Sequence, residues 1–312
     1  MINGKRLKNA MRSAIFGAAS SVLLLACSVR AQERPWEIAL EVPSFNTYYQ
    51  ENFNNPIGGR AEDLRGNSWD ALQIHPLITY RAWQQLHLPL FLSIEATIPI
   101  VTVKRLEIGD EYKPSGVTDL TQQENVAHED LTARAALGWE ILPFLQPYAG
   151  IVRSRFTSER EGQLDGTQAG KLTPDPNQDY TETVYSTQLC FGIQGAIPLN
   201  ANGDILIRYD AGYEIPQSVF VSDSYFGTGA WGEGTTGYTI SGRAQLDLPF
   251  RAIGLFADHD GYYTIGGMIS KREWNGDGSQ GMTWHEDYPV NIVWPQNFVI
   301  QAGGFVGIGM FF

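Results

Sequence analysis

The chain has 312 residues, and its 34 acidic side chains outnumber its 22 basic ones, which gives a formal net charge of −12. Residues 1–31 hold five basic residues and no acidic one, so the remainder carries 17 basic against 34 acidic groups, a net charge of −17. This balance disfavours nucleic acid and anionic lipid as general partners.

The amino terminus has the order of regions typical of a secretory signal. Basic residues precede an apolar run from Ala14 to Ala26, and a short polar segment ends at Ala31. The apolar run is too short for a membrane-spanning helix, which needs about 20 residues. We therefore expect residues 1–31 to be a cleaved signal peptide and residues 32–312 to be one mature domain. An alternative stays open, because the residues before Cys27 resemble a lipobox in which this cysteine would be lipidated.

Alternating apolar side chains predict ten strands in the mature part. Each strand has one apolar face and one polar or small face, the period of two expected where successive side chains point to opposite sides of a sheet. The predicted strands cover residues 36–42, 72–81, 88–100, 131–141, 148–156, 185–194, 205–214, 238–248, 252–270 and 296–312. Short turns, several with proline where a missing amide costs little, alternate with five longer loops of about twenty residues.

The fifth predicted strand requires a choice of face. We place Tyr148, Val152 and Phe156 on its apolar outer face, which turns Arg153 and Arg155 inward.

The ninth predicted strand leaves the strand count open. Asp258-His-Asp-Gly261 could itself be a turn, because Asp-Gly is a strong hairpin signal. A turn there would split the segment and raise the count towards twelve.

The last stretch, Gln296 to Phe312, is apolar on one face along its whole length and small or apolar on much of the other. Its outward face needs an apolar solvent. It resembles the terminal strand of bacterial outer-membrane β-barrels, which finish on Phe and keep alternate preceding positions apolar. The matching residues are Val306, Ile308, Met310 and Phe312.

This resemblance implies an all-β fold, a closed antiparallel up-and-down transmembrane β-barrel in the bacterial outer membrane. It also implies export through the periplasm, and it makes the four matching residues a signal for the barrel-assembly machinery.

Turning the apolar faces outward leaves acids and arginines inside. We expect a lumen charge network of Glu37, Glu41, Glu95, Arg134, Glu140, Arg153, Arg155, Arg208, Asp210, Arg243, Asp247, Asp258 and Asp260. Isolated buried charges are very costly, so these groups must pair. Because barrels near eight strands have interiors that side chains can fill, we expect a filled lumen and no wide pore.

Catalytic chemistry finds little support in the sequence. Outer-membrane barrels include the omptin proteases, which are also ten-stranded, but the resemblance covers strand count and chain length only. Where those proteases carry an Asp-His pair, the chain has Asp210-Ala-Gly212. Asp258-His259-Asp260 could supply a base and a carboxylate, but neighbours on a strand point to opposite faces, which favours a turn. We therefore expect no catalytic residue, no metal and no cofactor.

The leading functional prediction is a monomeric, non-enzymatic barrel that presents five surface loops to lipopolysaccharide, host or matrix. The alternatives are a narrow cation-preferring channel lined by the inward acids, and an outer-membrane hydrolase of omptin-like or lipid-acting type. Outer-membrane lipid, lipopolysaccharide and the barrel-assembly machinery are the expected partners, and nucleic acid is not. The sequence names no specific ligand or substrate.

Overall fold

The computed structural model describes residues 34–53, 61–82, 88–103, 105–112, 118–168, 171–174, 180–223, 228–232, 236–254, 256, 258–275, 280–285, 288–293 and 296–312. The expected signal peptide, residues 1–31 with Cys27, lies outside the described residues.

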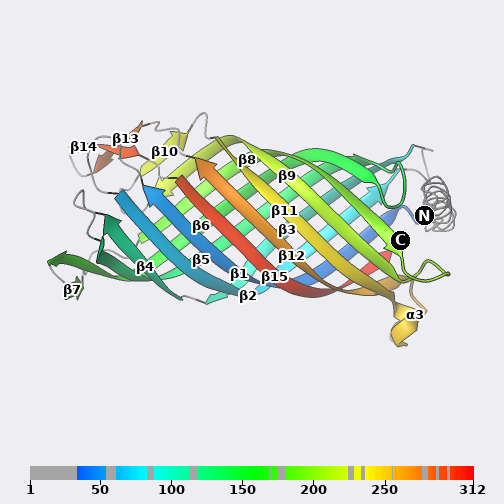
Figure 1. Ribbon diagram of the computed structural model, residues 1–312. Coiled ribbons are helices and arrows are strands. Elements are labelled where there is room, and N and C mark those ends of the chain that lie inside the picture. Colours follow the sequence, from blue (N-terminus) through cyan, green and yellow to red (C-terminus); the bar gives the residue numbers. More distant parts are fainter. Residues whose placement is uncertain are drawn as a thin grey trace, which may run out of the picture.

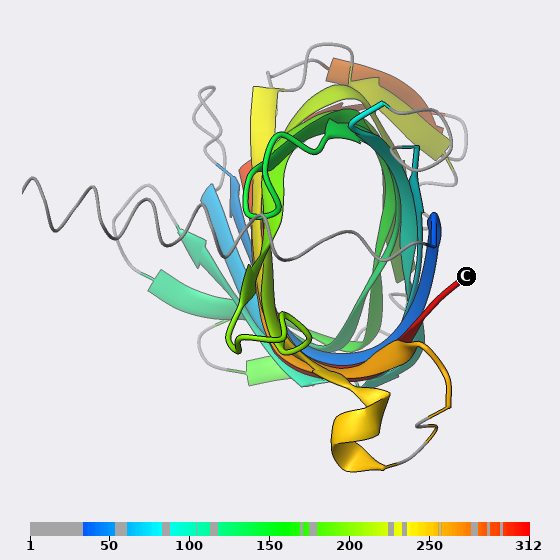
Figure 2. The same cartoon turned by 90° about the vertical axis from the view of Figure 1, so that its right-hand side faces the viewer.

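Ten strands in the described part of the chain close into an antiparallel barrel (Figures 1 and 2). They are β1 (Trp36–Phe53), β2 (Ala61–Arg81), β3 (Leu90–Val103), β5 (Thr118–Trp139), β6 (Gln146–Gln168), β8 (Tyr180–Pro198), β9 (Leu206–Asp223), β11 (Thr236–Pro249), β12 (Gly261–Asn275) and β15 (Gln296–Phe311). Each strand pairs with the next in this order, and β1 pairs with β15 to complete the ring. The predicted fold class and the count of ten are confirmed.

The two ends of the barrel differ. One end holds the turns at 140–145 and 199–205, the connection from β11 to β12, the start of β1 and the end of β15 (Figure 1). We name it the turn end, and we name the opposite end the loop end. Five shorter strands lie towards the loop end: β4 (Arg105–Tyr112), β7 (Lys171–Pro174), β10 (Thr228–Gly232), β13 (Gln280–His285) and β14 (Tyr288–Val293). β4, β7 and β10 pair with barrel strands, and β13 and β14 pair with each other.

The barrel strands are longer than the sequence pattern predicts. β6 has 23 residues and β5 has 22, whereas a tilted strand crosses a bilayer with about 9–11. The ring therefore continues well beyond the thickness of a membrane, and it does so towards the loop end.

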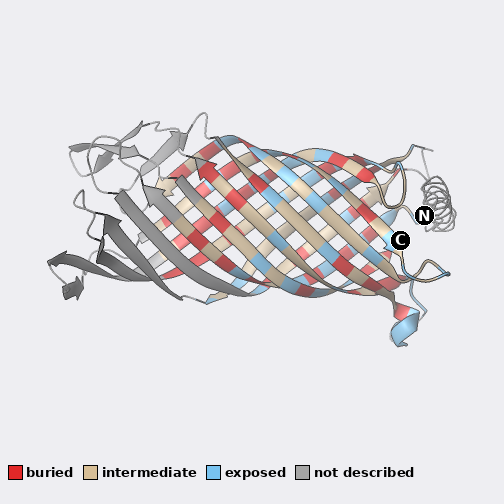
Figure 3. Cartoon of the chain, in the orientation of Figure 1, coloured by how far each residue is buried: buried red, intermediate tan, exposed pale blue. Residues whose placement is uncertain are grey.

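Burial alternates along the strands (Figure 3). Many of the buried positions are polar, whereas the exposed positions of the strands are largely apolar. On β1, the outward Ile38 and Leu40 are 46% and 47% exposed, whereas the inward Glu37 and Glu41 are 2% and 1% exposed. A continuous exposed apolar belt of this kind is unfavourable in water and is the expected outer surface of a barrel in lipid.

The predicted face of the fifth strand is wrong. In β6, Tyr148, Val152 and Phe156 are buried in the lumen, and Arg153 and Arg155 are exposed on the outer wall. The prediction turned the apolar side chains of this strand to the lipid and so placed both arginines inside, where they would avoid the cost of a charge on the lipid face. That cost falls to about 0–1 kcal/mol near the membrane boundary, whereas the lumen needs bulky side chains to fill it.

The start of the ninth predicted strand is also wrong. The short helix α3 (Phe250–Ile253) follows Pro249 and ends at Gly254, whose φ of 79° is readily adopted only by glycine. β12 then begins at Gly261, so the Asp-Gly turn exists but adds no strand. Asp258 and Asp260 are exposed at the rim and do not belong to the lumen network. No helix among the described residues is long and apolar enough to cross a membrane.

Candidate functional site in the lumen

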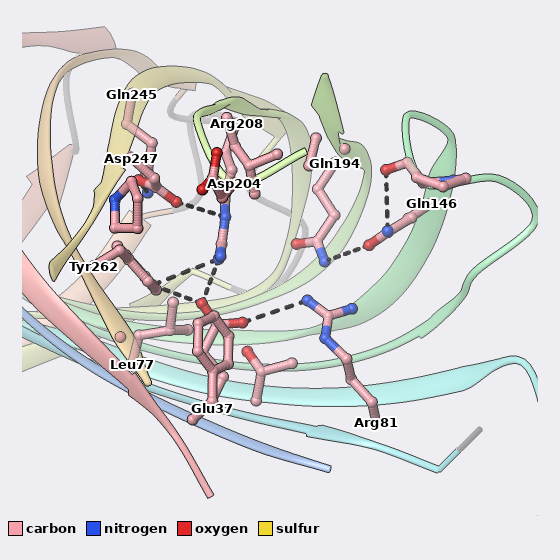
Figure 4. Close-up of a pocket in the computed structure, with 18 of the residues that line it drawn as sticks. Glu37, Leu77, Arg81, Gln146, Gln194, Asp204, Arg208, Gln245, Asp247 and Tyr262 are labelled. Carbon is pink, nitrogen blue, oxygen red and sulfur yellow. Dashed lines mark hydrogen bonds and ion pairs between the residues drawn. The ribbon is translucent and has the colours of Figure 1, made fainter. Parts of the chain in front are cut away.

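A cavity of about 860 Å³ occupies the lumen at the turn end (Figure 4). Inward side chains of strands from all around the ring line it, because every second residue of each strand points to the axis. We refer to this cavity as the vestibule.

Glu37 is the first hub of the vestibule wall. It accepts a hydrogen bond from the Tyr262 hydroxyl at 2.6 Å, and its carboxylate pairs with Arg81 at 3.4 Å and with Arg208. Arg208 also pairs through Nε with Asp247 at 2.7 Å. Figure 4 shows these groups converging from β1, β2, β9, β11 and β12.

Arg134 on β5 is the second hub. Its Nε lies 2.7 Å from Glu95, and its Nη2 lies 2.8 Å from Asp210. Tyr148 accepts a hydrogen bond from Arg134 at 2.8 Å and donates one to Asp210 at 2.7 Å. One guanidinium thus satisfies two carboxylates and a hydroxyl from three other strands, β3, β6 and β9.

His75 joins the network to its third hub. Its Nδ1 lies 2.9 Å from Glu41, and its Nε2 lies 3.6 Å from Glu95. Arg243 pairs with the other oxygen of Glu41 and donates from Nε to Gln245 at 2.9 Å. The imidazole therefore lies between two carboxylates that two different arginines also neutralise.

Small residues make room for the rings that complete these hubs. A Cβ at Gly309 would overlap the Tyr262 ring, and one at Gly192 would overlap the Tyr148 ring. Each tyrosine lies over a glycine of a neighbouring strand and so extends its hydroxyl to a carboxylate.

Most of the predicted charged residues are brought together in the lumen. These are Glu37, Glu41, Glu95, Arg134, Glu140, Arg208, Asp210, Arg243 and Asp247. The predicted network lacks Arg81, His75 and Tyr262, and Tyr148 was assigned to the outer face. Alternation along β2 places Arg81 and His75 inward and is the signal that could have found them, whereas finding the two tyrosines requires knowing which glycines lie beside them.

The network holds six carboxylates against four arginines and His75, a formal charge of −2 with a neutral imidazole. Each of these carboxylates already has a cationic partner. The arrangement therefore neutralises charge within the wall, and an ion moving along the lumen would have to compete with these pairs.

A second, smaller cavity of about 120 Å³ lies beyond the network. Arg272 and Asp130 line it and pair at 2.9 Å, and the Arg272 guanidinium lies 5.1 Å from the Trp274 ring.

An apolar cluster, here named the aromatic plug, follows towards the loop end. Its members come from six strands and are at most 7% exposed: Tyr49, Phe156, Val184, Val219, Val221, Trp274 and Val299. The centroid of the Phe156 ring lies 6.0 Å from that of Tyr49 and 6.0 Å from that of Trp274. These residues lie on two separate arcs of the ring, β12-β15-β1 and β9-β8-β6, and the ring contacts of Phe156 with Tyr49 and Trp274 join the arcs, so the plug spans the lumen.

A serine and a histidine are hydrogen-bonded at the edge of the plug. Ser158 Oγ lies 2.9 Å from His128 Nδ1, a pairing that serine hydrolases use. Both residues are 0% exposed, and the His128 ring stacks on Phe156. A substrate cannot reach the hydroxyl in this structure, so the pair satisfies polar groups inside the plug. Sequence spacing could not reveal it, because the two residues lie on neighbouring strands 30 positions apart.

The remaining candidate for catalysis lies at the rim. Asp258, His259 and Asp260 are exposed at the turn end, where Asp260 lies 3.7 Å from Arg34. Within the described ranges, no three His, Cys, Asp or Glu side chains are grouped as metal ligands.

The fold is similar to those of known outer-membrane proteins, although the sequence is not. No protein-family model matches the chain, and no curated sequence does. The outer-membrane protease OmpT from Escherichia coli matches with a TM-score of 0.62 at 10% identity, over 91% of this chain and 100% of that one. The translocator domain of the autotransporter NalP from Neisseria meningitidis matches with a TM-score of 0.35 at 10% identity, over 97% and 98% of the two chains. At such identity the OmpT match speaks for the fold alone. The chain is therefore a ten-stranded β-barrel of the outer-membrane type.

Proposed function

We propose that the protein is a non-conducting outer-membrane barrel that carries an extracellular surface on a rigid, filled stem. The aromatic plug is the observation that supports this proposal most directly. Seven buried apolar side chains from six strands occupy the lumen above the charge network. An apolar constriction opposes the passage of ions, which would lose water there and gain few polar partners.

The alternative function, a narrow cation-preferring channel, is supported by the polar vestibule, which an ion could enter from the turn end. That cavity is nevertheless lined by carboxylates that are already paired, and it leads to the plug. A cation entering from the turn end would meet little unpaired negative charge and then an apolar barrier.

Single-channel recording in planar bilayers tests the proposal. We expect no conductance steps from the wild-type protein, and steps from the double variant Phe156→Ala/Trp274→Ala, in which two rings of the plug are removed. Phe191→Ala is the matched control, because Phe191 is 46% exposed on the outer wall of the neighbouring strand β8. Wild-type steps as large as those of the double variant would refute the proposal.

The display role rests on the length of the strands beyond the membrane and on the added strands at the loop end. It is tested by single cysteines on intact cells with a membrane-impermeant thiol reagent. We expect Ala230→Cys in β10 to be labelled, and Asn202→Cys in a turn to be labelled only after the outer membrane is opened. Buried Cys190 should stay unlabelled in both variants. Labelling of Asn202→Cys alone on intact cells would reverse the topology.

A further inference from the structure

Two arginines on the outer wall have no role in the lumen. Arg153 and Arg155 are two residues apart on β6, so their side chains leave the same face of the sheet. Arg153 lies between Ala133 of β5 and Thr187 of β8, and Arg155 lies between Leu131 of β5 and Tyr185 of β8. Two small residues, a leucine and an aromatic ring thus flank the two exposed arginines, and none of them is an acid.

These arginines lack the partners that the other cations have among the side chains that the structure describes. Among the residues that the structure describes, neither guanidinium makes an ion pair or a hydrogen bond. Lys271, which also leaves the outer wall, donates to the Tyr238 hydroxyl and to Glu273, each at 3.1 Å. Unpaired charge on a wall that faces lipid is favourable only where an anion or water can meet it.

The position of Arg153 and Arg155 along the barrel axis determines which part of the membrane they contact. Arg155 is the tenth residue of β6. With a rise of about 3.3 Å per residue and a tilt of about 40°, it lies roughly 23 Å above the start of the strand, near the top of an apolar band about 25 Å tall. Arg153 lies slightly lower and can extend its long side chain to the same level. The Tyr185 ring, 6.1 Å from that of Phe220, is placed as interfacial aromatic residues are.

We infer that Arg153 and Arg155 form a binding site for the phosphate groups of lipopolysaccharide in the outer leaflet; this rests on the proposed orientation, with the loop end outside. A guanidinium binds phosphate through two parallel hydrogen bonds, and two guanidinium groups at one level can hold one phosphorylated sugar headgroup. Because the chain as a whole is acidic, these two arginines form a local basic patch on an otherwise acidic protein. Tyr185 supplies the flat surface against which the sugar packs.

The experiment compares binding of lipopolysaccharide, of enzymatically dephosphorylated lipopolysaccharide and of phosphatidylglycerol to the detergent-purified barrel. We expect the Arg153→Gln/Arg155→Gln variant to bind lipopolysaccharide at least about tenfold more weakly than wild type, because charge-assisted hydrogen bonds are lost. Wild type should bind the dephosphorylated form as weakly as the variant binds the intact one. Lys271→Gln is the matched control and should bind as wild type does.

Three results would overturn the inference: unchanged affinity of the double variant, equal binding of dephosphorylated lipopolysaccharide, or equally tight, arginine-dependent binding of phosphatidylglycerol. Heat-modifiable migration on gels verifies that each variant forms the closed barrel. The conductance measurement is independent of this site, so a conducting wild type would refute the proposed function and leave the lipid site standing. Labelling that reversed the topology would overturn the inference as well, because the two arginines would then lie near the inner leaflet.

Discussion

The two halves of the lumen are filled by opposite means. At the turn end, carboxylates and arginines pair around a vestibule, whereas towards the loop end rings and valines pack into the aromatic plug. The difference shows that a barrel of this size can stabilise its interior either by matching charges across the axis or by excluding water. It also makes the halves sensitive to different substitutions.

The largest expected effect comes from breaking a hub of the charged half. Arg134→Met leaves the carboxylates of Glu95 and Asp210, whose side chains are only 17% and 16% exposed in the lumen, without their guanidinium. Removing one partner of a buried ion pair costs about 3–5 kcal/mol, and we expect a loss at the upper end of that range because two carboxylates are affected. Urea unfolding in detergent measures it.

The control uses the same residue type on the outer wall. Arg153→Met should change the free energy of unfolding by less than about 1 kcal/mol, because no buried carboxylate loses its partner. Equal stability of the two variants would contradict the account of the charged half.

The next effect concerns the plug. Phe156→Ala removes a ring that contacts Tyr49, His128 and Trp274. The lost burial and the resulting cavity should cost about 3–4 kcal/mol in the same unfolding assay. Phe191→Ala, on the outer wall, should cost much less, and a larger loss there than at Phe156 would place the dominant packing outside the lumen.

A smaller change tests the hydroxyl that completes a hub. Tyr262→Phe keeps the ring over Gly309 and removes the hydrogen bond to Glu37. A hydrogen bond to a charged group contributes about 1.5–3 kcal/mol, so we expect a loss of about 2 kcal/mol. The neighbouring Tyr263 is on the outer face, and Tyr263→Phe is the control; a greater loss at Tyr263 would argue against the role of Tyr262.

The smallest effect lies at the exposed rim and depends on pH. The Asn200 amide and then the Arg251 guanidinium, which both donate to Asp204, lower the pKa of that carboxyl below its usual value. A lowered pKa stabilises the folded state at pH values above the pKa of the unfolded chain, and this contribution is lost as pH falls through the folded-state pKa. Because Arg251 is largely exposed, Asp204→Asn should cost less than about 1 kcal/mol at neutral pH. The difference from wild type should shrink as pH falls below the ordinary pKa of an aspartate and disappear below the lowered folded-state pKa, and a difference that grows on acidification would contradict this sign.

The faces of most strands were predictable because alternation is a local property. From Trp36 to Val42 every second residue is apolar and faces the lipid, so the acids between them, Glu37 and Glu41, must face the lumen. On β6 the two faces carry comparable patterns, and what decides between them is the register with glycines of other strands. That information is not local, so Tyr148 and Arg153 were assigned to the wrong sides.

The extent of the strands was less predictable for a related reason. After Phe156 the sequence of β6 becomes polar and loses the alternation that marks a lipid-facing strand. Backbone pairing between β5 and β6 nevertheless continues as far as Gln122 and Asp165. The His128–Ser158 contact was likewise invisible, because pairing brings together residues whose spacing along the chain carries no signature.

The position of Glu37 has a consequence for how the ring is made. This residue belongs to the first strand, while Arg208 and Tyr262 come from β9 and β12, on the far side of the junction between β1 and β15. In an unjoined sheet, β1 and β15 are opposite margins, and the carboxylate keeps only Arg81 within reach. When β1 pairs with β15, the ion pair and the hydrogen bond across the lumen form in the same step. This coupling favours cooperative closure of the barrel over a series of partly closed intermediates.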